Sequence, residues 1–137
     1  MVIKLIPIAF LLATCQHLST NNQASKSNFE QFNSFYSSFT SDSTFQLSRV
    51  IFPLKGARYF FSDTFKTDST LWTKDKWEFN RANIYQLDSA KFKTKILVQE
   101  SGVKENIWIE NSGFMMERHY KQINGKWYLV YYLLSEL

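Results

Sequence analysis

The chain has 137 residues, enough for one domain, and its aromatic share of 18% supplies material for a substantial core. From residue 29 onward, 14 basic and 12 acidic side chains leave a net charge of +2, against +4 for the whole chain. The lysines are scattered and form no run of the kind that follows a phosphate backbone, so the composition argues against nucleic-acid binding.

The first 14 residues are typical of a bacterial lipoprotein signal peptide. Lys4 supplies the charged start, and residues 5–13 form an apolar run that is far shorter than the roughly 20 residues of a membrane-spanning helix. The run ends in Leu-Ala-Thr-Cys at residues 12–15, which resembles a lipobox, with threonine where a smaller residue is usual. Several acyl chains on Cys15 would give stable anchoring. The alternative is an ordinary secreted protein in which Cys15 is incidental.

Residues 15–28 comprise the candidate lipidation site and a flexible tether. The tether is rich in Ser, Asn, Gln and Thr and has no apolar periodicity. Cys15 is the only cysteine, so no intramolecular disulfide can form. Gln16 follows it where an aspartate would favour inner-membrane retention. We therefore expect residues 29–137 to form a domain that is lipid-anchored to the bacterial outer membrane and faces the periplasm.

Helical signals open this domain. Aromatic residues recur at helical spacing through residues 29–39, and Asn28 can cap that helix. The aromatic stripe is expected to be core, because phenylalanine is usually buried. Residues 41–43 offer a second cap, for a short helix over residues 45–50. That helix should end before Pro53, because the residue preceding a proline is pushed to extended geometry.

The rest of the chain is expected to be mainly β-structure. A short helix capped by Thr73 is expected to run to Phe79, and residues 62–69 are polar and turn-like. The expected strands are residues 55–61, 71–72, 84–87, 92–100 and 107–109, with turns at residues 101–102 and 111–113. Helices first and an antiparallel meander afterwards predict an α+β domain, with the helices packed in the concave face of a strongly bent antiparallel sheet.

The strongest local signal is Asn124-Gly125, which lies between two strand-like runs and predicts a hairpin with a two-residue type I′ turn. Counting outward from the turn assigns side chains to alternating faces. The pairs expected on the more apolar, core-facing side are Gln122–Trp127, Tyr120–Leu129, Arg118–Tyr131 and Met116–Leu133. The pairs expected on the other side are Lys121–Tyr128, His119–Val130 and Glu117–Tyr132.

Four segments carry a resemblance to a known family. They are Phe29-x-x-Phe32, the block Ser-Asp-Ser-Thr-Phe-Gln-Leu-Ser-Arg-Val-x-Phe-Pro-Leu at 41–54, Trp77-Glu78-Phe79, and Gly-Lys-Trp-Tyr-Leu-Val at 125–130. Over about residues 29–134 the chain resembles domain-of-unknown-function family 4348, which comprises lipoprotein-like proteins of Bacteroides-type bacteria. The resemblance implies a nuclear transport factor 2-like (cystatin-like) fold. It implies no known activity and no catalytic motif.

The sequence contains no recognisable catalytic, cofactor or metal motif. The two histidines, His17 and His119, are isolated, and there is neither a nucleophile elbow nor a phosphate-binding glycine loop. We therefore expect a non-enzymatic domain that binds a small molecule or a protein. Arg118 could offer its planar fork of donors to an anionic ligand, or it could pair with a carboxylate inside the fold. The full candidate pocket comprises Arg118, Tyr120, Tyr131, Trp77 and Arg49.

Two other function classes stay open. Cones of the resembled fold include isomerases and dehydratases, and here Asp88 or Tyr120 would have to act as the acid or base. An Asp88 in a closed cavity would favour that enzyme, whereas an exposed Asp88 and a filled cone would favour the binding domain. A self-associating structural lipoprotein is the third class. It would form a homodimer through Tyr128, Val130 and Tyr132 on the outer hairpin face.

Overall fold

The computed structural model describes residues 29–60 and 72–136. Several expectations lie outside these residues: the signal peptide at 1–14, the lipidated cysteine and tether at 15–28, the Asn28 cap, the polar segment at 62–69, and Leu71 of the expected strand at 71–72.

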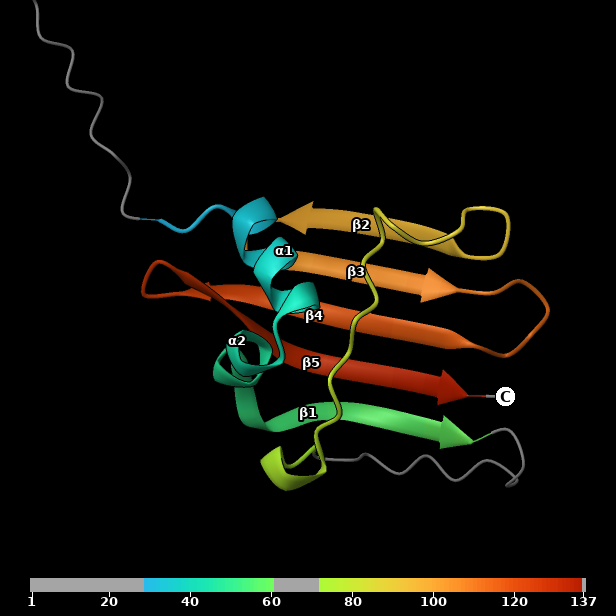
Figure 1. The fold of residues 1–137 in the computed structure, drawn as a ribbon, viewed down its shortest axis with the longest axis horizontal. Helices are drawn as coiled ribbons and strands as arrows, with labels where there is room; N and C mark the ends of the chain where they lie inside the picture. Colours follow the sequence, from blue (N-terminus) through green and yellow to red (C-terminus); the bar gives the residue numbers. More distant parts are fainter. Residues whose placement is uncertain (1–28, 61–71, 137) are drawn as a thin grey trace, which may run out of the picture.

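A five-stranded sheet organises the domain, and two helices and the segment 72–92 cross one of its faces (Figure 1). The strand order is β1-β5-β4-β3-β2. Strands β2 to β5 form the expected antiparallel meander, whereas β1 pairs with β5 in parallel, so the sheet is mixed. The elements are α1 (Phe32–Ser41), α2 (Ser43–Ser48), β1 (Val50–Phe60), the 3-10 turn η1 (Lys74–Lys76), β2 (Lys93–Gln99), β3 (Gly102–Trp108), β4 (Met115–Ile123) and β5 (Lys126–Glu136).

The helices follow the sequence pattern closely. Helix α1 begins at Phe32, three residues later than expected, because Glu30 is bound to the β4–β5 hairpin through its backbone N–H and the Gly125 carbonyl at 2.8 Å. The aromatic stripe is core, as expected, with Phe35 and Phe39 buried. Asp42 caps α2, its carboxylate accepting a hydrogen bond from the Phe45 N–H at 2.9 Å.

Strand β1 corrects the expected boundary at Pro53. The strand begins at Val50 and continues through Pro53, where residues 45–54 were expected to hold a helix and its end. A proline is tolerated here because β1 is an edge strand, and its register with β5 shifts between Val50 and Lys55. Leu54 instead forms two backbone hydrogen bonds with Trp72, both 2.8 Å.

The segment that crosses the sheet corrects two further expectations. Residues 84–87 form turns, where a strand was expected, and the helix expected over residues 73–79 shrinks to η1. The apolar residues Ala82, Ile84 and Leu87 pack against the core from above the sheet. The apolar residues of this segment therefore pack against the core-facing side of the sheet. Residues 84–87 do not form a strand, because their backbone is not paired with a neighbouring strand in the described part of the chain.

The hairpin turn is confirmed, and part of its register is wrong. Asn124 and Gly125 have φ values of 49° and 79°, the positive values that a type I′ turn requires. The expected pairs hold from the turn as far as Tyr120–Leu129. Beyond that, β5 carries one extra residue, Val130, so Arg118 lies opposite Tyr132 and His119 opposite Tyr131. Because of this bulge, Tyr132 faces the core. The four expected pairs that lie farther from the turn than Tyr120–Leu129 are therefore incorrect.

Candidate functional site: a buried tyrosine, arginine and glutamate network

A buried ion pair occupies the helix-facing side of the sheet, where the sequence suggested a pocket. Glu105 on β3 and Arg118 on β4 are cross-strand partners, and each side chain is 1% exposed. Arg118 Nε donates to Glu105 Oε2 and Arg118 Nη2 donates to Glu105 Oε1, both at 2.8 Å. This two-pronged geometry is the strong form of a charge-assisted pair.

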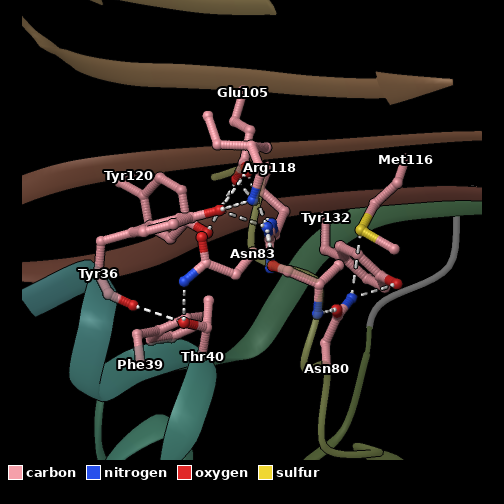
Figure 2. A network of polar contacts seen from close by, with 12 residues as sticks. Tyr36, Phe39, Thr40, Asn80, Asn83, Glu105, Met116, Arg118, Tyr120 and Tyr132 are labelled. Carbon is pink, nitrogen blue, oxygen red and sulfur yellow. Dashed lines mark hydrogen bonds and ion pairs between the residues drawn. The ribbon is translucent and has the colours of Figure 1, made fainter. Parts of the chain in front are cut away.

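Two tyrosines and the crossing segment complete this network (Figure 2). Tyr36 of α1 donates its hydroxyl to Glu105 and accepts from Arg118 Nη2 at 3.1 Å. Tyr120 donates to Glu105 at 3.2 Å. Arg118 Nη2 also donates to the Ala82 carbonyl at 2.7 Å. One guanidinium thus connects α1, β3, β4 and the segment that crosses the sheet.

Burial sets the protonation of the network. Desolvation raises the pKa of Tyr36 and of Tyr120 well above the usual tyrosine value, and the Arg118 charge offsets only part of that rise. Burial alone would lower the Arg118 pKa, but the facing acidic groups of Tyr120 and Glu105 raise it beyond its usual range. The tyrosines are therefore neutral donors to a charged pair.

A second polar cluster fixes the crossing segment over β5. Gln46 is fully buried and donates to the carbonyls of Phe39 at 2.7 Å and Asn80 at 2.8 Å. Its amide oxygen accepts from Trp77 Nε1 at 3.1 Å. Asn80 Nδ2 in turn donates to the Tyr132 hydroxyl at 3.0 Å (Figure 2). The segment is therefore held by specific hydrogen bonds as well as by apolar packing.

The structure does not assemble the five predicted pocket residues into one site. Arg118 and Tyr120 lie together in the buried network. Trp77 lies in the second cluster, against Trp72 and Tyr132 at centroid distances of 6.2 and 5.3 Å. Tyr131 is on the opposite face, stacked on His119 at 4.6 Å, because of the bulge in β5.

The environment of Arg118 distinguishes the two roles expected for it, binding of an anionic ligand and pairing with an internal carboxylate. An open anion site needs a guanidinium without an internal partner, whereas Arg118 is paired with Glu105. Sequence reasoning missed Glu105, although its alternation with Val103 and Ile107 on β3 predicts a core-facing position. Asp88, the other candidate acid or base, is exposed, and its carboxylate accepts from the Ala90 N–H at 2.9 Å.

Arg49, the fifth predicted residue, belongs to a separate arrangement that we call the Glu30 clamp: Glu30, Arg49 and Trp127. The Glu30 carboxylate is held by Arg49 Nη1 at 2.9 Å, Arg49 Nη2 at 3.0 Å and the Trp127 N–H at 2.8 Å. Trp127 Nε1 also donates to the Glu30 carbonyl at 2.9 Å. The clamp fastens the beginning of the described chain to the hairpin.

One concave feature of the surface lies at the opposite end of the sheet. It is an open depression of about 590 Å³ at the turn between β3 and β4. Its lining residues are Trp108, Ile109, Glu110, Asn111, Gly113, Phe114, Met115 and Ser135. Within residues 29–60 and 72–136, no three His, Cys, Asp or Glu side chains gather as a metal ion would require. In the same part of the chain, no helix is long and apolar enough to cross a membrane.

Comparison with known proteins supports the fold. A protein-family model matches residues 30–135. An NTF2-like protein from Bacteroides fragilis NCTC 9343 superposes with a TM-score of 0.57 at 20% identity, over 80% of this chain and 48% of that one. A protein from Bacteroides uniformis ATCC 8492, determined by NMR, superposes with a TM-score of 0.50 at 22% identity, over 79% and 77% of the two chains. No curated protein matches.

These similarities confirm the prediction of an α+β domain with a nuclear transport factor 2-like fold. The chain spans about half the length of the B. fragilis protein. At such low identity the likeness concerns the fold alone. Membership of family 4348 and the lipid anchor stay predictions.

Proposed function

The chain belongs to the family whose model matches residues 30–135 and has a nuclear transport factor 2-like fold, and from this premise we propose that it is a lipid-anchored, non-enzymatic binding domain of the bacterial cell envelope. Its finer assignment is a family 4348 lipoprotein. It is acylated at Cys15 and held at the outer membrane on the periplasmic side. It needs neither a cofactor nor a metal, and its ligand is a protein that meets the outside of the domain.

One observation carries the non-enzymatic part of the proposal: the interior site that the sequence suggested for a ligand is occupied by the Glu105–Arg118 ion pair. The Arg118 guanidinium, which is the group best suited to an anionic ligand, is engaged by Glu105 and Tyr36. Small-molecule sites are usually enclosed hollows with a few free polar groups. Arg118 Nε and Nη2 instead bind Glu105, Tyr36 and the Ala82 carbonyl, and only Nη1 has no hydrogen-bond partner among the described residues. We therefore place the ligand at the surface. The depression beside Phe114 and Met115 has the aromatic and methionine lining that is enriched in protein interfaces.

The enzyme alternative has less support. A general acid or base must come within hydrogen-bond reach of a substrate. Asp88 is exposed at a turn, where its carboxylate accepts from the Ala90 N–H. Tyr120 is fully buried, and its hydroxyl is bound to Glu105.

The proposal is tested by removing the buried positive charge of Arg118 and comparing the loss of stability with that caused by removing a partly exposed positive charge, Lys104. Arg118→Met should lower the free energy of unfolding by about 3–5 kcal/mol, because Glu105 would be left as an uncompensated buried charge. Lys104→Met is the control: Lys104 also pairs with a carboxylate on β4, at 2.8 Å to Glu117, but it is one-third exposed. Its loss should cost at most about 1 kcal/mol.

Urea titrations of the two variants give these values directly. An Arg118→Met protein as stable as Lys104→Met would show that the guanidinium has no structural partner. That result would restore an interior ligand site and contradict the proposed surface-binding function.

A further inference from the structure

Several large apolar side chains are exposed toward the end of the sheet where the described chain begins. Phe29 is 60% exposed, Val98 80% and Ile123 41%. Val98 precedes the β2–β3 turn, and Ile123 precedes the β4–β5 turn. Both turns and the start of the described chain lie at the same end of the molecule, the left end in Figure 1.

The β2–β3 turn lies beside β4, a few residues before the β4–β5 turn. A Cβ atom added to Gly102, just after the β2–β3 turn, would lie 2.1 Å from the Tyr120 carbonyl oxygen and 3.4 Å from Lys121 Cγ. Phe29 is held beside the other turn, because the N–H of the next residue, Glu30, donates to the Gly125 carbonyl at 2.8 Å. The exposed apolar side chains therefore lie at one end of the sheet, with Val98 on its helix-facing side and Ile123 on the other side.

Lysines accompany these apolar residues. Lys121 and Lys126 are exposed on either side of Ile123. Two nearby carboxylates are already neutralised: Glu30 by Arg49 and Glu117 by Lys104. Glu100 in the β2–β3 turn is acidic, and the two lysines outnumber it. Exposed apolar side chains with lysines around them are the composition of surfaces that bind at a membrane interface.

We propose that this end of the domain docks onto an anionic phospholipid surface, and the proposal rests on the lipid anchor proposed above. The docking end comprises Phe29, Val98, Ile123, Lys121 and Lys126. The apolar side chains enter the headgroup region, and the lysines meet lipid phosphates. Lysines close to a membrane surface are attracted to anionic lipids in this way.

The Glu30 clamp holds the start of the described chain at the docking end, so the proposed tether leads into the domain there. Thirteen residues separate Cys15 from Phe29. Even a fully extended segment of that length spans only about 45–50 Å, at roughly 3.3–3.6 Å per residue. An acylated Cys15 therefore keeps the docking end close to the bilayer, and this high local concentration favours a weak surface contact. The depression at the other end of the sheet then faces away from the membrane.

Fluorescence quenching by lipid tests the orientation. Once Cys15 is acylated, Ile123→Cys and Met115→Cys each carry one free thiol for an environment-sensitive dye. Met115 is a matched control, since it is 38% exposed and is the first residue of β4, whose last residue is Ile123. In phosphatidylethanolamine and phosphatidylglycerol vesicles with brominated acyl chains, the dye at position 123 should be quenched several-fold more than the dye at position 115. Equal quenching at the two positions would overturn the proposal.

The charge requirement is tested in the labelled Ile123→Cys protein. Lys121→Gln with Lys126→Gln should greatly reduce its quenching, whereas Lys91→Gln with Lys93→Gln, at the far end of β2, should leave it unchanged. Equal quenching in both double variants would rule out docking through lipid phosphates.

Flotation of the vesicles separates a failure of docking from a failure of the anchor. A protein that floats without selective quenching at position 123 is anchored and does not dock. If the protein does not float, the anchor is absent. The same comparison is then made with the Cys15→Ser chain and added vesicles, where selective quenching at position 123 would still support docking and equal quenching would overturn it.

Discussion

Arg118 and Glu105 form a buried ion pair that stabilises the fold only when both partners are present. Removing two charges from water is expensive, and the pair offsets this through two direct bonds and the hydroxyl of Tyr36. Tyr36 comes from α1, and Glu105 and Arg118 come from adjacent strands. The pair therefore fixes how the helix sits on the sheet, and no single-residue feature of the sequence announces it.

The buried tyrosines predict a loss of stability at alkaline pH. Burial raises the pKa of Tyr132 to about 12, above the value near 10 in an unfolded chain. The folded state thus holds the phenolic proton more tightly. Its contribution to stability is complete below about pH 10 and is lost as the pH rises from there towards 12. Tyr36 and Tyr120, whose pKa values are also raised by burial, act in the same direction.

Each such tyrosine should contribute a slope that rises to at most about 1.4 kcal/mol per pH unit in that window. Urea titrations between pH 9 and 11.5 should therefore show a smaller decline for Tyr132→Phe than for the wild type. Tyr85→Phe is the control, because that ring is already in contact with water in the fold, 68% exposed. A wild-type stability that is constant up to pH 11.5 would contradict the buried placement of these phenols.

Local rules predicted those elements whose structure depends on neighbours in sequence. Asp42 caps α2 and Asn124-Gly125 makes the turn, because each conformation is set within four residues. The bulge at Val130 and the parallel pairing of β1 with β5 depend on residues distant in the chain. Alternation continued past a bulge assigns the wrong face, which is why Tyr131 was predicted in the core and Tyr132 outside.

The hairpin turn provides the test at the scale of an element. Gly125→Val should destabilise the domain by about 1 kcal/mol or more, because a β-branched residue is strained at a φ of 79°. Lys126→Val places the same side chain one position later, at the start of β5, and should change stability little. Thermal unfolding compares the two. An unchanged melting temperature for Gly125→Val would contradict the type I′ turn.

The molecule as a whole has a filled interior and two different ends. The Glu30 clamp and the exposed residues Phe29, Val98 and Ile123 mark one end, and the depression beside Phe114 marks the other. An anchor near the first end would present the second end to a partner in the periplasm. Composition and helical periodicity predicted the layered α+β architecture. They did not identify the partner of Arg118, because Glu105 is 13 residues away and the pairing of its strand with β4 was not predicted.

The lipid anchor is the property on which the proposed function depends most. Cells that express the wild-type chain should incorporate radiolabelled palmitate into it, and the protein should fractionate with the outer membrane. Cys15→Ser should lose the label and move to the soluble periplasmic fraction, with the melting temperature of the domain unchanged. A wild-type protein that takes up no palmitate and fractionates like Cys15→Ser would contradict the assignment of a lipid-anchored envelope domain.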